Sequence, residues 1–120
     1  MSIDRLFVYG TLKPGQSRWP ALAPFVDPLE PVVAAEVDGQ LWATPWDWPA
    51  LTAGSGTVRG VLVTLHPDRV EDALARLDAI EGVDTGLFER VTVKTRAGRV
   101  CSIYLWPKGT DGFTLLDREW

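Results

Sequence analysis

The sequence contains few of the residues that form disulfides and metal sites. It has one cysteine and one histidine among 120 residues. Cys101 therefore has no intrachain disulfide partner, and its apolar neighbours predict a buried structural thiol rather than a catalytic one. His66 has no second histidine or cysteine within ligand spacing. The sequence therefore predicts no metal site and no cofactor.

Long apolar runs and clusters of basic residues are also missing. No apolar run approaches the roughly 18 residues of a membrane-spanning helix, and the N-terminus lacks the pattern of a signal peptide. We therefore expect a cytoplasmic protein with no membrane partner. Phosphate binding calls for clustered Lys and Arg, whereas the net charge here is −4 and the basic residues are scattered. We expect no nucleic-acid partner.

The residues that are abundant favour a folded globular domain. Hydrophobic residues make up 46% of the chain and six of them are tryptophans. A chain of this length and composition is expected to form one domain over residues 1–120, with its own core.

An apolar strand followed by a glycine loop begins the chain. Residues 6–9 read L-F-V-Y and are followed by Gly10. Where the strand ends, the N–H groups of Gly10, Thr11 and Leu12 lose their ladder partners, and the missing Cβ of Gly10 allows a bound group to approach. The pattern predicts a cradle for an anion or a carbonyl, although many strand–turn segments with glycine bind nothing.

A helix with one apolar face is predicted before a single acidic residue. The apolar stripe consists of Val70, Ala73, Leu74, Leu77 and Ile80. At 100° per residue, Glu81 returns to within roughly 20° of Val70, so its carboxylate lies on the apolar face. Glu81 also lies at the helix C-terminus, before the C-cap candidate Gly82. Burial and the helix dipole should both raise its pKa toward the range that a general acid or base needs.

Spacing alone leaves two roles open for Glu81. It is either a general acid/base or the buried half of an ion pair with Arg90, nine residues later. Asp78, one helical turn earlier, is expected to be a structural hydrogen-bond partner.

The remaining patterns predict a mixed α/β (α+β) fold. We expect a small, mostly antiparallel barrel of five or six strands with one main α-helix. A break near Asp38-Gly39 predicts a bulge or a turn, and Trp42 is expected to face the core. The Pro-rich stretch 16–31 leaves room for a helical turn or two around residues 19–25. Further strand patterns cover residues 32–44, 57–65, 89–95 and 99–106.

An unusual tryptophan pair lies in the predicted loop 45–56, which reads P-W-D-W-P-A-L and ends in A-G-S-G. Either Trp46 and Trp48 cap one end of the barrel, or one of them forms a wall of a substrate pocket. The sequence leaves both possibilities open.

Two motifs resemble those of the γ-glutamylcyclotransferase-like (AIG2-like) family. The segment Y-G-T-L-K-P-G at residues 9–15 is similar to the family loop Y-G-[TS]-L-x-x-G. The segment L-D-A-I-E-G at residues 77–82, followed by an aromatic residue and Arg90, is similar to the second family motif. Phe88 stands where many members have Tyr, and the second Trp of the 45–56 loop is another departure.

The resemblance implies an enzyme that cyclises a γ-glutamyl amide to 5-oxoproline. It implies Glu81 as the catalytic acid/base and a substrate-binding loop formed by Tyr9, Gly10, Thr11 and Leu12. The partner would be a small γ-glutamyl compound, but the sequence gives neither its leaving amine nor the oligomeric state. One competing hypothesis is a binding module that uses the same loop and Glu81 without turnover. Another is an interaction domain that uses the Trp46/Trp48 loop, with no concave site beside Glu81.

Overall fold

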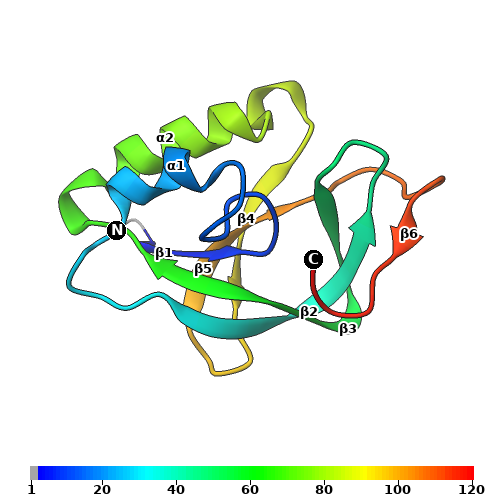
Figure 1. The fold of residues 1–120 in the computed structure, drawn as a ribbon, viewed down its shortest axis with the longest axis horizontal. Coiled ribbons are helices and arrows are strands. Elements are labelled where there is room, and N and C mark those ends of the chain that lie inside the picture. The colour runs from blue at the N-terminus through cyan, green and yellow to red at the C-terminus, as the bar shows by residue number, and fades with distance from the viewer. Residues whose placement is uncertain (1–2) are drawn as a thin grey trace.

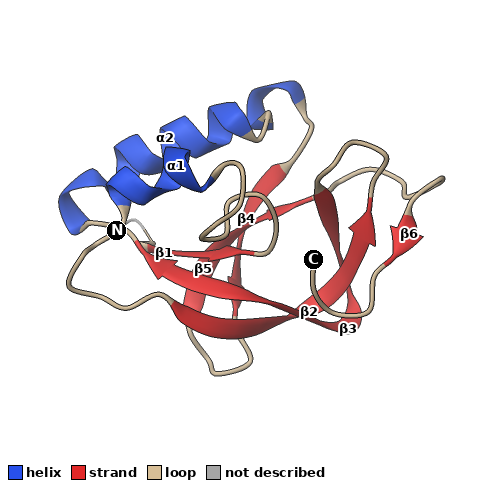
Figure 2. Ribbon diagram, in the orientation of Figure 1, coloured by secondary structure: helices blue, strands red, loops and turns tan. Residues whose placement is uncertain are grey.

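The predicted strands pair into one curled, six-stranded mixed sheet in the computed structural model, which describes residues 3–120 (Figures 1 and 2). The order across the sheet is β4-β5-β1-β3-β2-β6. The strands are β1 (Arg5–Val8), β2 (Val33–Ala43), β3 (Pro49–Thr64), β4 (Glu89–Lys94), β5 (Val100–Leu105) and β6 (Thr114–Leu115). The α+β half-barrel confirms the predicted fold class.

Helices cover one side of the sheet (Figure 2). The main helix is α2 (Val70–Ile80), and the short α1 (Trp19–Leu22) lies beside it. Three single turns of 3₁₀ helix complete the elements: η1 (Ala23–Phe25), η2 (Pro67–Arg69) and η3 (Val83–Thr85). No helix within residues 3–120 is long and apolar enough to cross a membrane.

Strand β1 lies in the middle of the sheet and is buried on both faces. It pairs antiparallel with β3 and parallel with β5, where Leu6 lies opposite Ser102. Because side chains alternate along a strand, Leu6 and Val8 join the core under the helices, while Phe7 and Tyr9 join a second core on the other face. The loop that follows β1 is therefore held by a well-packed strand.

The β2–β3 hairpin confirms one prediction and corrects two. The register shifts between Asp38 and Gln40, so the predicted irregularity is a bulge. Residues 49–56, predicted as a loop, are the first half of β3, because pairing with β2 overrides the low strand propensity of Gly and Ser. Trp42 does not face the core. Leu41 takes the core side, so the half-buried Trp42 points to the other face and donates its indole N–H to Thr52.

The predicted C-terminal end of α2 is confirmed. At its other end, α2 follows directly on η2, where the His66 side chain accepts a hydrogen bond from the backbone N–H of Asp68. Gly82, with φ of 69°, takes the left-handed conformation that ends the helix. The predicted apolar stripe is buried at Val70, Ala73, Leu74 and Leu77. Cys101 is also buried, as expected.

Candidate active site

A pocket lies where the loop after β1 meets the C-terminal end of α2. Its walls come from six separate parts of the chain. They are residues 7–12, Arg18, Trp48 with Pro49, Glu81, Phe88 and Tyr104. The tertiary structure therefore brings the predicted loop and the predicted acid/base into one cavity.

Glu81 is a buried acidic residue in this pocket. Only 8% of the residue is exposed. Burial raises the pKa of its carboxyl group above the ordinary value, and the Arg18 guanidinium opposes that shift. The Arg18 Nη1 atom lies 3.7 Å from Glu81 Oε2, too far for a strong hydrogen bond. The carboxylate is thus not locked in a tight ion pair.

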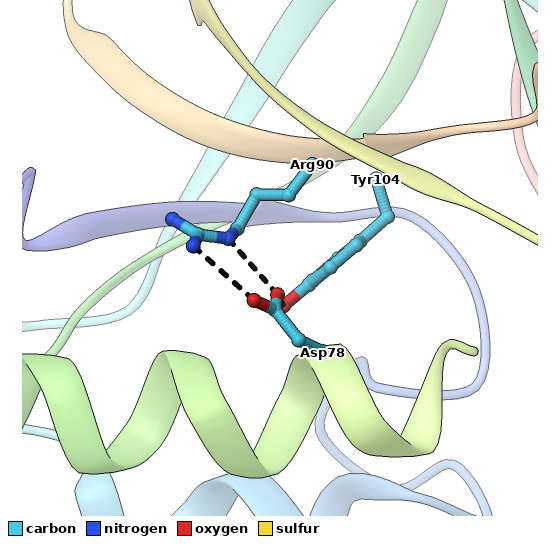
Figure 3. A network of polar contacts seen from close by, with 3 residues as sticks. All are labelled: Asp78, Arg90 and Tyr104. Atoms are coloured by element: carbon cyan, nitrogen blue, oxygen red, sulfur yellow. Dashed lines mark hydrogen bonds and ion pairs between the residues drawn. The ribbon is translucent and has the colours of Figure 1, made fainter. Parts of the chain in front are cut away.

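Arg90 is not the partner of Glu81, so the predicted ion-pair alternative is wrong. Its guanidinium forms a two-point contact with Asp78, at 2.9 Å from Nε to Oδ1 and 3.2 Å from Nη2 to Oδ2 (Figure 3). The Tyr104 hydroxyl donates to the same Oδ1 atom at 2.8 Å. Asp78 is therefore the structural hydrogen-bond partner that the sequence suggested. It ties α2 to β4 and β5 one helical turn before Glu81.

The loop after β1 offers unpaired backbone donors. Its carbonyl groups are used: Gly10 accepts from the Lys13 N–H at 3.0 Å, and Thr11 accepts from the Arg18 N–H at 2.8 Å. Within residues 3–120, the N–H groups of Gly10, Thr11 and Leu12 donate to no backbone acceptor. Because all three residues line the pocket, these groups are available to an oxygen of a bound molecule.

Comparison with known proteins identifies the family to which this arrangement belongs. A family model described as gamma-glutamyl cyclotransferase, AIG2-like, matches residues 6–120. The chain belongs to this family. Among curated proteins, none matches the chain.

Solved structures show the same fold as this cyclotransferase family member. The chain is 27% identical to the protein ytfP from Escherichia coli, with a TM-score of 0.63 over 95% of this chain and 92% of that one. An uncharacterized protein from Pyrococcus horikoshii is 21% identical, with a TM-score of 0.71 over 97% of this chain and 86% of that one. An AIG2-like protein from Mus musculus is 17% identical, with a TM-score of 0.68 over 100% of this chain and 90% of that one.

The structure gives a second reason for a glycine at position 10 of this AIG2-like chain. A Cβ atom on Gly10 would lie 2.6 Å from Cγ of Pro49, so the glycine makes room for the start of β3. Tyr9 also has a structural bond, because its hydroxyl donates to the Tyr104 carbonyl at 2.6 Å. The Leu12 side chain is buried in the core under the helices. With the Tyr9 hydroxyl already bonded, the polar groups of this loop without a hydrogen-bond partner in residues 3–120 include the backbone N–H groups of residues 10–12 and the Thr11 hydroxyl.

Two tyrosines of the pocket remain neutral phenols. Burial, followed by the nearby Glu81 charge, raises the pKa of Tyr9 far above its ordinary value. Burial and the hydrogen bond to Asp78 do the same for the pKa of Tyr104. Neither hydroxyl can serve as a base near neutral pH, which leaves Glu81 as the acid/base candidate.

Sequence reasoning missed Arg18. It lies just before α1 in a stretch without helical or strand periodicity, where spacing predicts no neighbours. Its place in the pocket follows from the loop fold, in which its N–H binds the Thr11 carbonyl. No sequence signal in this family member identifies it in advance.

The sequence left open whether one tryptophan of the pair walls a pocket. Trp48 lines the pocket, whereas Trp46 lies outside it and is 52% exposed. Their rings stack with centroids 5.3 Å apart. Phe88 also lines the pocket, and its ring centroid lies 5.5 Å from that of Trp48. In the described part of the chain, no three His, Cys, Asp or Glu side chains gather as metal ligands.

Proposed function

We propose that the protein is a γ-glutamylcyclotransferase that converts a γ-glutamyl amide into 5-oxoproline and a free amine. In this proposal Glu81 is the acid/base, and the loop formed by Tyr9, Gly10, Thr11 and Leu12 binds the substrate. The observation that carries the proposal is the buried Glu81 carboxylate, which shares one pocket with the unpaired N–H groups of that loop. Membership of the cyclotransferase family supports it.

The reaction is an intramolecular aminolysis. The substrate's α-amino nitrogen attacks its own γ-carbonyl carbon, which forms the ring C–N bond, and the bond from that carbon to the leaving nitrogen then breaks. The loop N–H groups hold a substrate oxygen, as backbone donors do in oxyanion holes. Because the two reacting groups belong to one molecule, the enzyme mainly has to fold the substrate and move protons.

Glu81 performs both proton transfers. The ionised carboxylate takes a proton from the substrate ammonium, which makes the nitrogen nucleophilic. The resulting carboxylic acid then protonates the leaving nitrogen. The regenerated carboxylate removes the second proton that the attacking nitrogen must lose to become the ring amide, and the released amine takes it up as an ammonium ion, so two protons pass from the α-nitrogen to the leaving amine without another reactant. A pKa raised by burial suits this double role, because a stronger base accepts the first proton more readily.

Release of 5-oxoproline from a panel of γ-glutamyl amides tests the activity. We expect release by the parent protein and loss of at least roughly a hundredfold in kcat with Glu81→Gln, a typical contribution of general acid–base catalysis. Glu71→Gln is the matched control, since Glu71 is exposed on the same helix. Absence of release from every amide, or full activity of Glu81→Gln, would overturn the proposal.

A second candidate is a binding module without turnover, and the contact between Arg18 and Glu81 favours it. A guanidinium 3.7 Å away promotes the ionised form of Glu81, which then holds a ligand amine by charge. Ligand binding to Glu81→Gln separates the two candidates. A catalyst keeps most of its affinity and loses turnover, whereas a binding module loses affinity. The pocket beside Glu81 weighs against a purely structural domain.

A further inference from the structure

The pocket has a buried floor and a three-residue rim. Most of its lining residues, Glu81 among them, are buried. Only Thr11, Arg18 and Trp48 are half-exposed. A substrate whose γ-carbonyl lies beside Glu81 therefore extends its leaving group outward past these three side chains. The chemistry of the rim selects the leaving group.

Trp48 gives the rim a half-exposed aromatic ring that its neighbours hold in place. Its ring packs against Phe88, Trp106 and Trp46, with centroid distances of 5.5, 5.7 and 5.3 Å. These neighbours hold the ring by contacts from three separate segments of the chain.

The turn that carries Trp48 is also constrained. The Thr44 hydroxyl donates to the Trp48 carbonyl at 2.5 Å and accepts from the Trp46 N–H at 3.2 Å. Asp47 takes a left-handed conformation with φ of 58°. A ring that is held in place loses little entropy when another ring stacks on it, which favours an aromatic ligand.

Arg18 gives the rim a positive charge with unused donors. Its side chain is 38% exposed, and its only ion-pair contact within residues 3–120 is the 3.7 Å approach to Glu81. A guanidinium has five N–H donors and binds a carboxylate well through two of them. Aromatic rings also attract cations, but Arg18 and Lys108, which lies over Trp106 at 5.5 Å, disfavour a cationic leaving group.

We infer that the preferred leaving group is an aromatic α-amino acid, whose ring stacks on Trp48 and whose carboxylate binds Arg18. This inference rests on the proposed cyclotransferase function. It narrows the substrate to γ-glutamyl dipeptides of aromatic amino acids, and it makes Trp48 and Arg18 specificity-determining residues. The reacting bond is the same for every leaving amine, so the preference appears as a ratio of kcat/KM values.

Four amides test the two contacts separately. γ-Glutamyl-phenylalanine carries both the ring and the carboxylate, γ-glutamyl-phenethylamine only the ring, γ-glutamyl-alanine only the carboxylate, and γ-glutamyl-ethylamine neither. For the parent protein, we expect kcat/KM to be roughly tenfold higher for the phenylalanine amide than for the alanine amide, because only the former makes the aromatic stacking contact. We also expect kcat/KM to be roughly tenfold higher for the phenylalanine amide than for the phenethylamine amide, because only the former has a carboxylate to bind Arg18.

Variants assign each preference to its residue. Trp48→Leu should remove most of the preference for an aromatic ring and keep the preference for a carboxylate. Arg18→Met should remove most of the preference for a carboxylate and keep the preference for a ring. Trp48→Phe keeps a ring and should retain the aromatic preference. This variant still tests the role of the ring if Trp48→Leu does not fold. Trp42→Leu is the matched control, because Trp42 lies outside the pocket and should leave both ratios unchanged.

The outcomes separate this inference from the function on which it rests. If no amide releases 5-oxoproline, the cyclotransferase function fails. If amides are cleaved but kcat/KM for the alanine amide equals or exceeds that for the phenylalanine amide, the cyclotransferase function stands and the inferred specificity is overturned. The inference is also overturned if Trp48→Leu lowers kcat/KM for all four amides equally, because Trp48 would then have only a structural role.

Discussion

Arg18 and Glu81 face each other across the pocket, with Nη1 and Oε2 3.7 Å apart. The carboxylate belongs to the end of α2, and the guanidinium to the irregular segment before α1. This pairing leaves Arg90 free to hold Asp78, so two arginines have two separate tasks. Arg18 tunes the acid/base candidate, whereas Arg90 fixes the helix that carries it.

Loss of the Arg18 charge should move the acid limb of the pH profile. The positive charge favours the ionised form of Glu81, so Arg18→Gln should raise the Glu81 pKa further. Because the base must be ionised, kcat/KM should begin to fall at a higher pH than in the parent protein. Arg76→Gln, an exposed change on α2, should leave the profile in place. An unmoved acid limb in Arg18→Gln would show that Arg18 does not tune the titrating group.

Glu81 should lower stability as pH rises. A carboxyl group whose pKa is raised by folding has no effect below its unfolded pKa of ~4.3. It destabilises the fold as pH rises through that value, and the full cost is reached above the raised folded pKa. Glu81→Gln should therefore be at least as stable as the parent at pH 8, by thermal unfolding, with the difference shrinking toward pH 4. A variant that melts well below the parent at pH 8 would mean that Glu81 stabilises the fold.

The Asp78 anchor should matter for both stability and activity. Asp78→Asn weakens the two-point contact with Arg90, which should cost about 1–3 kcal/mol in the free energy of unfolding. Misplacing α2 should also lower kcat/KM by roughly ten- to a hundredfold. Glu36→Gln, which breaks the exposed pair with Arg59, should cost under about 1 kcal/mol and leave activity unchanged. Equal effects of the two variants would contradict the anchoring role.

A double-mutant cycle tests the contact between Gly10 and Pro49. Gly10→Ala places a Cβ 2.6 Å from the Pro49 ring and should cost about 1–3 kcal/mol in stability. In a Pro49→Ala background the same change should cost much less, because the clashing ring atoms are gone. Equilibrium unfolding of the four proteins gives the coupling energy. A coupling energy near zero would mean that Pro49 is not the reason for the glycine, and would leave access for the substrate, the role that we first predicted.

The Thr11 hydroxyl should contribute little to recognition. No hydrogen bond from this side chain is found within residues 3–120, and the proposed contacts to the substrate come from the unpaired backbone N–H groups of the same loop. Thr11→Val preserves the shape of the side chain and should change kcat/KM by less than about tenfold, which is below the effect of one typical charged hydrogen bond. A larger loss would show that the hydroxyl, rather than the backbone, binds the substrate.

The sequence by itself determined the features that depend on local periodicity. The 3.6-residue apolar stripe of α2 places Glu81 on the buried face, and Gly82 ends the helix there. The apolar run of β1 and its glycine likewise predicted a strand that ends in a loop. The pattern of residues on this one helix therefore predicted that Glu81 is buried, that it lies at the end of the helix and that its pKa is raised.

The tertiary structure alone decided which distant groups meet. Pairing with β2 turned residues 49–56 into a strand, although their composition is typical of a loop. The partner of Glu81 is Arg18, from a stretch without periodicity, rather than the nearby Arg90. The Pro49 ring, from β3, explains the glycine at position 10. These contacts join segments tens of residues apart, and their geometry comes from sheet register and loop closure, which no local pattern encodes.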